Sequence, residues 1–181
     1  MGSDKGLLRY HDSPQRAHVY GLLQPLCRQV FVSCNAAQSP DLLLPRIEDR
    51  FLGIGPMGGI LSAMQADPDA AWLTVACDLP LLRSATIEYL IAHRDPSVMA
   101  TAFRDASGLP EPLITIWEPR AYPLLLLALS EGLSCPRKIL MNTGVQLLHA
   151  PDISELQNVN DPSERLKALA QLNVHPQNDR S

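Results

Sequence analysis

The stretch Trp72-Leu73-Thr74-Val75-Ala76-Cys77-Asp78-Leu79-Pro80 decides the fold of this chain. The run from Trp72 to Cys77 is apolar or β-branched, which is typical of a buried strand, and we expect this strand to be central in its sheet. Asp78 follows at once and Pro80 breaks the strand, so the sequence predicts a carboxylate at the strand's end. Ligands of open α/β sheets bind beyond the carboxyl ends of the strands, which makes Asp78 the first candidate for a functional residue.

Strands and helices alternate on both sides of this stretch. Further strands or extended pieces are predicted over 29–34, 46–49, 98–103, 113–117, 145–148 and 157–159. Helices are predicted from Ser13-Pro14, with a kink or an early end at Pro25, from the turn 55–59 until Asp67, from Ser84, from Pro119 or Ala121, after 136 and from 162. This alternation argues for a Rossmann-like α/β fold, with a mostly parallel sheet covered by helices on both faces. The chain opens on a loop and a helix, so the first strand of such a fold is expected to be missing.

Two helix starts carry local signals. Ser13 is expected to cap the first helix, with Pro14 at its first position. Asp161 is expected to cap the last helix, with Pro162 at its first position and Glu164 completing a capping box.

Length and composition favour a single globular domain. A chain of 181 residues fits one domain over 1–174, followed by a polar tail over 175–181. With 46% hydrophobic and 19% charged residues the chain is not disordered, and a net charge of −4 gives no basic face for nucleic acid. No signal peptide or membrane span is visible, so we expect a cytoplasmic protein. The four cysteines lack CxxC spacing and are expected to be reduced, buried thiols.

Residue types alone leave the chemistry open. Asp78 is suited to Mg²⁺, but it is equally suited to capping the next turn. The glycine-rich turn 55–59 could present N–H groups to an anion, although such turns more often only reverse the chain. Arg137 and Lys138 could hold a phosphate or could form a solvated surface. No signature of a covalent nucleophile is present.

Five motifs in chain order resemble the molybdenum cofactor guanylyltransferase family of MobA-like nucleotidyltransferases. They are Met-Gly-Ser-Asp-Lys-Gly-Leu-Leu at 1–8, Phe-Val-Ser-Cys-Asn at 31–35, Ile-Glu-Asp at 47–49 with Gly-Pro-Met-Gly-Gly at 55–59, the strand ending Cys-Asp-Leu-Pro at 77–80, and Asn-Val-Asn-Asp-Pro at 158–162. The resemblance covers nearly the whole chain. It implies transfer of GMP from GTP to molybdopterin, with pyrophosphate released and Mg²⁺, or Mn²⁺ in its place, neutralising the phosphates.

The resemblance also implies roles for individual residues. Asp78 would hold the metal, and Lys5 and Asp78 would be the catalytic residues. The nucleotide would contact Lys5, Asn35, Asp49, Gly55, Gly58 and Asp78, and the acceptor would contact Pro112, Arg137, Asn158 and Asn160. Other proteins of molybdenum cofactor biosynthesis are possible partners.

One departure from the family pattern affects the expected activity. The family signature opens with a strand and a Leu-x-Gly-Gly-x-Ser-x-Arg turn, and residues 1–8 match only its second half. The resemblance is therefore to an N-terminally truncated member, in which catalysis is expected to be severely impaired. Three alternatives stay open: cytidylyl transfer from CTP, nucleotidyl transfer to a sugar phosphate, and a non-catalytic binding domain.

Overall fold

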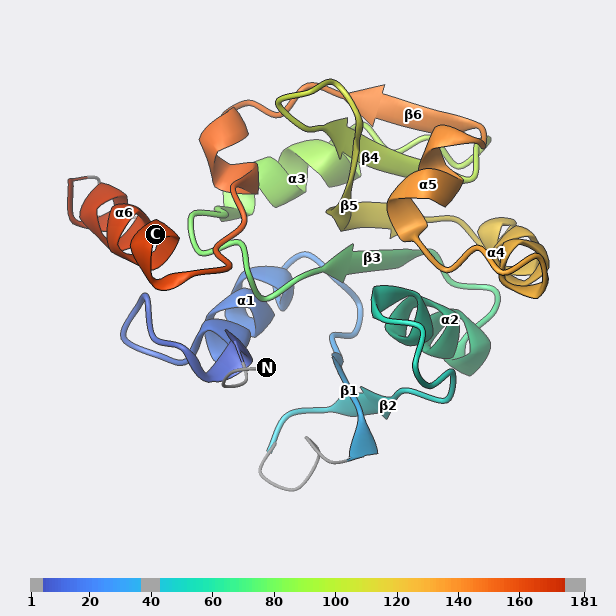
Figure 1. Ribbon diagram of the computed structural model, residues 1–181, viewed down its shortest axis with the longest axis horizontal. Coiled ribbons are helices and arrows are strands. Elements are labelled where there is room, and N and C mark those ends of the chain that lie inside the picture. The colour runs from blue at the N-terminus through green and yellow to red at the C-terminus, as the bar shows by residue number, and fades with distance from the viewer. Residues whose placement is uncertain (1–4, 37–42, 175–181) are drawn as a thin grey trace.

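The structure, a computed structural model, describes residues 5–36 and 43–174 and forms an α/β fold (Figure 1). Its helices are η1 (Lys5–Leu7), α1 (Gln15–Leu23), α2 (Pro56–Ala66), α3 (Ser84–Ala92), α4 (Ala121–Ser130), α5 (Pro136–Met141), η3 (Ile153–Leu156) and α6 (Pro162–Val174). Its strands are β1 (Val32–Cys34), β2 (Arg46–Glu48), β3 (Trp72–Val75), β4 (Ala100–Arg104), β5 (Pro110–Trp117) and β6 (Val145–Leu148). The expected tail over 175–181 lies outside the described residues.

The described strands form two sheets, not one. β1 pairs with β2 in parallel, and a second sheet has the order β3-β5-β4-β6. β5 runs antiparallel to both β3 and β4, while β4 and β6 are parallel. The expectation of a mostly parallel sheet is therefore wrong for the larger sheet, which is mixed.

A tight turn explains the antiparallel strand. Asp105 donates its backbone N–H to the Leu109 carbonyl at 2.7 Å, and Gly108 has a φ of 79°, which favours glycine. A turn this short can only join antiparallel neighbours. β5 also starts at Pro110, earlier than the expected strand over 113–117, because its first residues pair with the end of β4.

β3 lies at an edge of its sheet among the described strands, so its expected central position is wrong. Its partner is β5 on one side only. β3 also ends at Val75, which leaves Ala76 and Cys77 between the strand and Asp78. The predicted extended piece over 157–159 is not a strand, although the Val159 N–H binds the Asp78 carbonyl.

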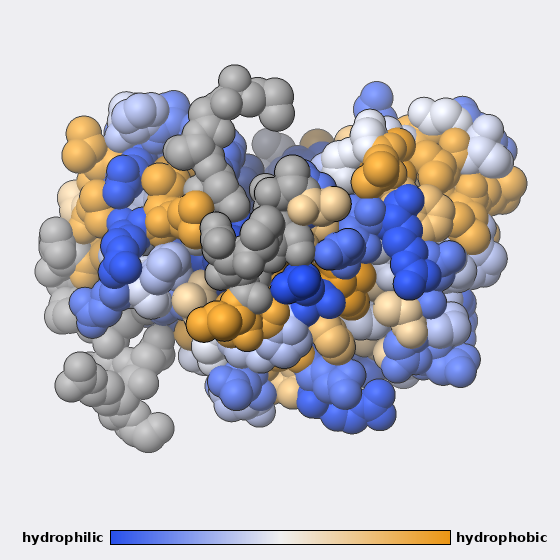
Figure 2. Space-filling view, turned by 90° about the horizontal axis from the view of Figure 1, so that it is seen from below, coloured by the Kyte–Doolittle hydropathy of each residue, from blue (hydrophilic) through white to orange (hydrophobic). Residues whose placement is uncertain are grey.

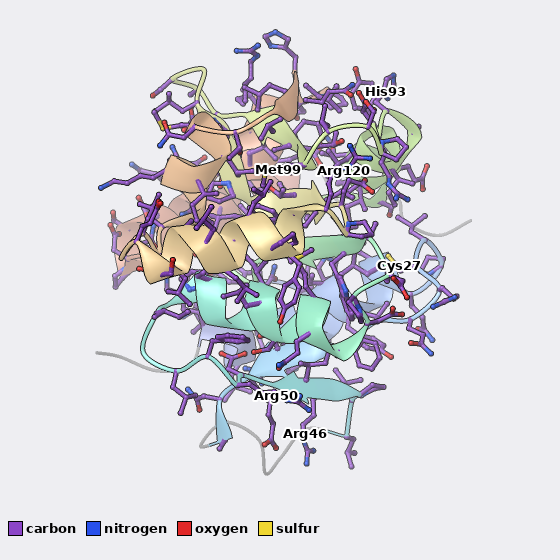
Figure 3. The ribbon with its side chains drawn as sticks, turned by 90° about the vertical axis from the view of Figure 1, so that its right-hand side faces the viewer. Cys27, Arg46, Arg50, His93, Met99 and Arg120 are labelled. Carbon is purple, nitrogen blue, oxygen red and sulfur yellow. The ribbon has the colours of Figure 1, made fainter. Side chains whose placement is uncertain are left out.

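Helices cover both faces of the larger sheet, as predicted. One core cluster joins α1 and α3 to the sheet through residues such as Leu22, Leu90 and Ile114. The other joins α2, α4 and α5 to it around Trp117, which is fully buried. Figure 3 shows α4 and α2 side by side on this second face, with Met99 near α4 and with Arg46 and Arg50 at the outer edge beyond α2. Among the described helices, none combines the length and apolar character needed to cross a membrane.

The helix signals are confirmed at the last helix and corrected at the first. The Asp161 carboxylate accepts the backbone N–H of Glu164 at 3.0 Å, and the Glu164 side chain accepts the N–H of Asn160 at 2.7 Å. α1 starts at Gln15 with Pro14 as its N-cap residue, so Ser13 is not the cap. All four cysteines are free, but only Cys34 is buried as expected. Cys27 and Cys77 are half-buried, and Cys135, which immediately precedes α5, is exposed.

Candidate active site

A groove of about 890 Å³ separates the two sheets. Its walls include residues 30–33 at β1 and residues 72–78 at β3, with parts of α1 and α2. β1 pairs only with β2, and β3 only with β5, among the described strands. Within residues 5–36 and 43–174, the strand edges that face the groove therefore have no neighbouring strand. Figure 2 views the molecule from the β1 and β2 side and shows hydrophobic and hydrophilic residues mixed over this face.

Three separate segments meet at Asp78. The Lys5 Nζ lies 3.6 Å from the Asp78 Oδ2 and donates a hydrogen bond of 2.6 Å to the Asn160 Oδ1. The Val159 N–H binds the Asp78 carbonyl at 2.9 Å, which holds the segment before α6 against the loop after β3. The structure thus brings together Lys5, Asp78 and Asn160, three of the predicted site residues.

Two buried acceptor oxygens belong to residues of these segments. The Asp78 Oδ1 and the Asn158 Oδ1 are both buried, and neither has a hydrogen-bond partner among the described residues. A buried acceptor without a donor costs about 1–3 kcal/mol, which a bound cation would offset. In the described part of the chain, no three or more His, Cys, Asp and Glu side chains are grouped so that they could hold a metal ion. Mg²⁺ needs no such group, because it commonly takes one or two carboxylates and completes its shell with water and phosphate.

The residues predicted to bind the nucleoside lie on the β1 and β2 side of the groove. The Ser33 hydroxyl donates to the Asp49 Oδ1 at 2.8 Å, and the Asp49 N–H binds the Cys34 carbonyl at 2.9 Å. Ser33 lines the groove, whereas Asn35 and Asp49 are not among its lining residues. Ser33 was missed in the sequence, where it reads only as one residue of a strand.

Gly55 and Gly58 shape the turn before α2. Gly55 has a φ of 63°, which favours glycine, and it is the N-cap residue of α2. A Cβ on Gly58 would collide with the Phe51 carbonyl, and the Gly58 N–H donates to the Gly55 carbonyl at 3.0 Å. The groove is lined by their neighbours Pro56 and Gly59 instead. The backbone conformation and packing of the turn therefore require glycine at both positions. Contact of Gly55 and Gly58 with a nucleotide stays a prediction.

On the acceptor side, Arg137 is engaged within the chain. Its guanidinium binds Asp105, and it donates to the Glu111 Oε2 at 3.2 Å. Glu111 is only 5% exposed, and burial raises the pKa of its carboxyl group. Burial also raises the pKa of Asp105, but donors from Leu109, Ser107 and Arg137 outweigh this and lower it overall. Pro112, next to Glu111, lines the groove. Glu111 was missed because a glutamate in a turn-like stretch normally predicts exposure.

The chain is similar to known proteins over most of its length. A family model described as "MobA-like NTP transferase domain" matches residues 1–148. The chain is 38% identical over 168 residues to a molybdenum cofactor biosynthesis bifunctional protein of Synechocystis, covering 91% of this chain but only 48% of that protein. It is 30% identical over 172 residues to the molybdenum cofactor guanylyltransferase of Pseudomonas putida KT2440, covering 92% of this chain and 88% of that protein.

A solved structure shows the same fold. The crystal structure of molybdopterin-guanine dinucleotide biosynthesis protein A from Archaeoglobus fulgidus superposes with a TM-score of 0.79. The match covers 96% of this chain and 92% of that one at 18% sequence identity. At this identity the likeness extends to the fold alone.

Proposed function

Because this chain belongs to the MobA-like NTP transferase family, we propose that it transfers GMP from GTP to molybdopterin. The relative named molybdenum cofactor guanylyltransferase supports this assignment, since the match covers most of both proteins. The observation that carries the proposal is the meeting of Lys5, Asp78 and Asn160 beside a groove large enough for a nucleotide. In the reaction, a phosphate oxygen of molybdopterin bonds to the α-phosphorus of GTP. The bond from that phosphorus to the β-phosphate oxygen breaks, and pyrophosphate leaves.

Positioning and charge neutralisation supply most of the catalysis in such a transfer. Asp78 and Asn158 would hold Mg²⁺, or Mn²⁺ in its place, through the two oxygens for which the described part of the chain provides no donor. The ion would neutralise negative charge on the reacting phosphates. The Lys5 ammonium, which contacts Asp78 and Asn160, is placed to move onto the triphosphate as a point charge.

Base preference is proposed to depend on Asp49. A carboxylate accepts from the N1–H and amino group of guanine, and the Ser33 hydroxyl orients this carboxylate through its Oδ1. Asn35 would help fix the nucleoside from the end of β1. We propose GTP over CTP and ATP. Competition binding of the four nucleotides tests this, and tighter binding of CTP would favour the cytidylyl alternative.

The acceptor is proposed to lie across the groove from the nucleoside. Pro112, Asn158 and Asn160 would contact it. Arg137, which binds Asp105 and Glu111, would contact the acceptor directly only if the acceptor displaced one of these two carboxylates. The proposed substrates are small molecules, and the cytoplasm is the expected location. Nucleic acid and membranes are not expected partners.

The decisive experiment measures pyrophosphate release and product formation with GTP, molybdopterin and Mg²⁺. We assay this chain beside a version in which a Leu-x-Gly-Gly-x-Ser-x-Arg turn precedes residue 1. Turnover by the extended version, with at least a 100-fold lower rate for the shorter one, is expected, because losing one preorganised donor already costs about 10²–10³ in rate. Product from a sugar phosphate but not from molybdopterin would overturn the acceptor. GTP binding without turnover by either version would favour a binding domain.

A further inference from the structure

Gln15 is a completely buried polar residue that the proposed chemistry does not use. It is the first residue of α1, and none of its surface is exposed. Its Oε1 has no hydrogen-bond partner among the described residues, although burying such an oxygen is costly. A hydrophobic side chain could fill this position without the free-energy cost of burying an unpaired oxygen. The other polar groups of Gln15 do make hydrogen bonds.

Gln15 binds both of the segments that supply Lys5 and Asp78. Its backbone N–H donates to the Leu8 carbonyl at 2.8 Å, and the Leu8 N–H binds the Lys5 carbonyl at 3.2 Å. These bonds hold the η1 turn that carries Lys5. On the other side, the Gln15 Nε2 donates to the Leu79 carbonyl at 3.3 Å. Leu79 directly follows Asp78.

We propose that Gln15 is a positioning residue that sets the loop of Asp78 against the turn of Lys5. The contact of 3.6 Å between the Lys5 Nζ and the Asp78 Oδ2 would then depend on a side chain that touches neither group. His11 provides a second link between the same regions, since its Nε2 lies 3.1 Å from the Pro80 carbonyl. The part of this inference that concerns binding of metal and nucleotide rests on the proposed function.

The hydrogen bonds of the Leu79 carbonyl show whether Gln15 is needed for the loop to fold or only for its position. Its carbonyl also accepts the Leu82 N–H at 3.3 Å, so losing Gln15 Nε2 does not leave a buried carbonyl without a donor. The Asp78 carbonyl keeps its bond from Val159. The loop would therefore stay folded without Gln15 but would lose the bond that fixes its distance from α1.

The first test compares Gln15→Met with Gln24→Met by hydrogen exchange. Met has nearly the size of Gln but cannot donate, and Gln24 is an exposed residue just after the same helix. For Gln15→Met we expect at least tenfold faster exchange over residues 78–82, unchanged exchange in β4 and β5, and a Tm within about 4 °C of wild type. Gln24→Met should change none of these.

The second test uses Gln15→Glu, which keeps the shape of the side chain. As a carboxylate it cannot donate to Leu79, but burial raises the pKa of a carboxyl group, and the protonated form can donate. Exchange over 78–82, relative to wild type at each pH, should therefore be fast at pH 8 and return towards wild type near pH 5. Gln15→Leu, which cannot donate at any pH, should show no such recovery.

The third readout is Mn²⁺ binding in the presence of GTP, followed by electron paramagnetic resonance. We expect about tenfold weaker Mn²⁺ binding for Gln15→Met and no change for Gln24→Met. Absence of Mn²⁺ binding by wild type would count against the proposed function alone, since the exchange measurements need no metal. Unchanged exchange over 78–82 in Gln15→Met, or a pH-independent Gln15→Glu, would overturn the positioning role.

Discussion

The Val159 backbone N–H donates to the Asp78 carbonyl oxygen at 2.9 Å and so joins the segment before α6 to the loop after β3. This bond fixes the main chain of Asp78, while its Oδ1 is buried and has no hydrogen-bond partner within residues 5–36 and 43–174. The Asn158 Oδ1, one residue before Val159, is in the same state. The two oxygens are thus presented by backbone that is already held, which is the arrangement that a preorganised cation site needs.

Asp78→Asn is expected to remove cation binding and leave the fold intact. An amide has no negative charge, so Mn²⁺ affinity measured in the presence of GTP should fall at least tenfold. Transfer should be lost when the same substitution is made in the extended version, in which the Leu-x-Gly-Gly-x-Ser-x-Arg turn precedes residue 1. Far-UV circular dichroism should match wild type, because the backbone bond to Val159 does not involve the side chain. Asp69→Asn changes an exposed carboxylate near the end of α2 and is the matched control. Transfer within a few-fold of wild type would make the metal assignment wrong.

Arg137→Met is expected to destabilise the protein by about 1–3 kcal/mol, because the buried Glu111 loses its charged donor. The pKa of Glu111 is already raised by burial and would rise further without the guanidinium. Thermal unfolding measures the effect, with Lys138→Met, at an exposed neighbour, as the control. Unchanged stability together with a raised KM for molybdopterin would instead assign Arg137 directly to the acceptor.

His18 is expected to make the fold sensitive to acid. Burial, with a smaller contribution from the stacked His11, lowers the pKa of His18 to about 4. The unfolded chain, with an ordinary His pKa of about 6.5, binds this proton more readily, so stability falls as the pH drops from about 6.5 to 4. His18→Gln should flatten the decline of Tm across this window by several °C, since each kcal/mol corresponds to about 2–4 °C for a domain of this size. His149→Gln, at an exposed histidine, should leave the decline unchanged, and equal slopes for all three proteins would contradict the prediction.

The sequence predicts those features whose causes are local. Asp161 and Glu164 form their helix start from bonds within four residues, so the start of α6 follows from the sequence. The antiparallel partner of β3 could not be predicted, because it depends on β5 returning from the tight turn after β4. Asp78 is predicted as a site residue from its position directly after a strand. Lys5 is predicted as a site residue only from the resemblance to the family. The burial of Gln15 and Glu111 results from long-range packing that no local pattern records.

Among the described strands, β1 and β3 each have one edge without a neighbour, and we expect these edges to cause self-association. Unpaired strand edges are templates for pairing with another chain, and Phe31, 36% exposed beside β1, adds an apolar surface at the groove. Sedimentation velocity over increasing protein concentration should show a growing dimer or oligomer fraction. Phe31→Lys should reduce this fraction severalfold, since a lysine at a strand edge disfavours pairing. Leu127→Lys replaces an exposed leucine on α4, away from the groove, and should not reduce it. If Leu127→Lys lowers association and Phe31→Lys does not, the contact lies on α4, and the groove is not the association surface.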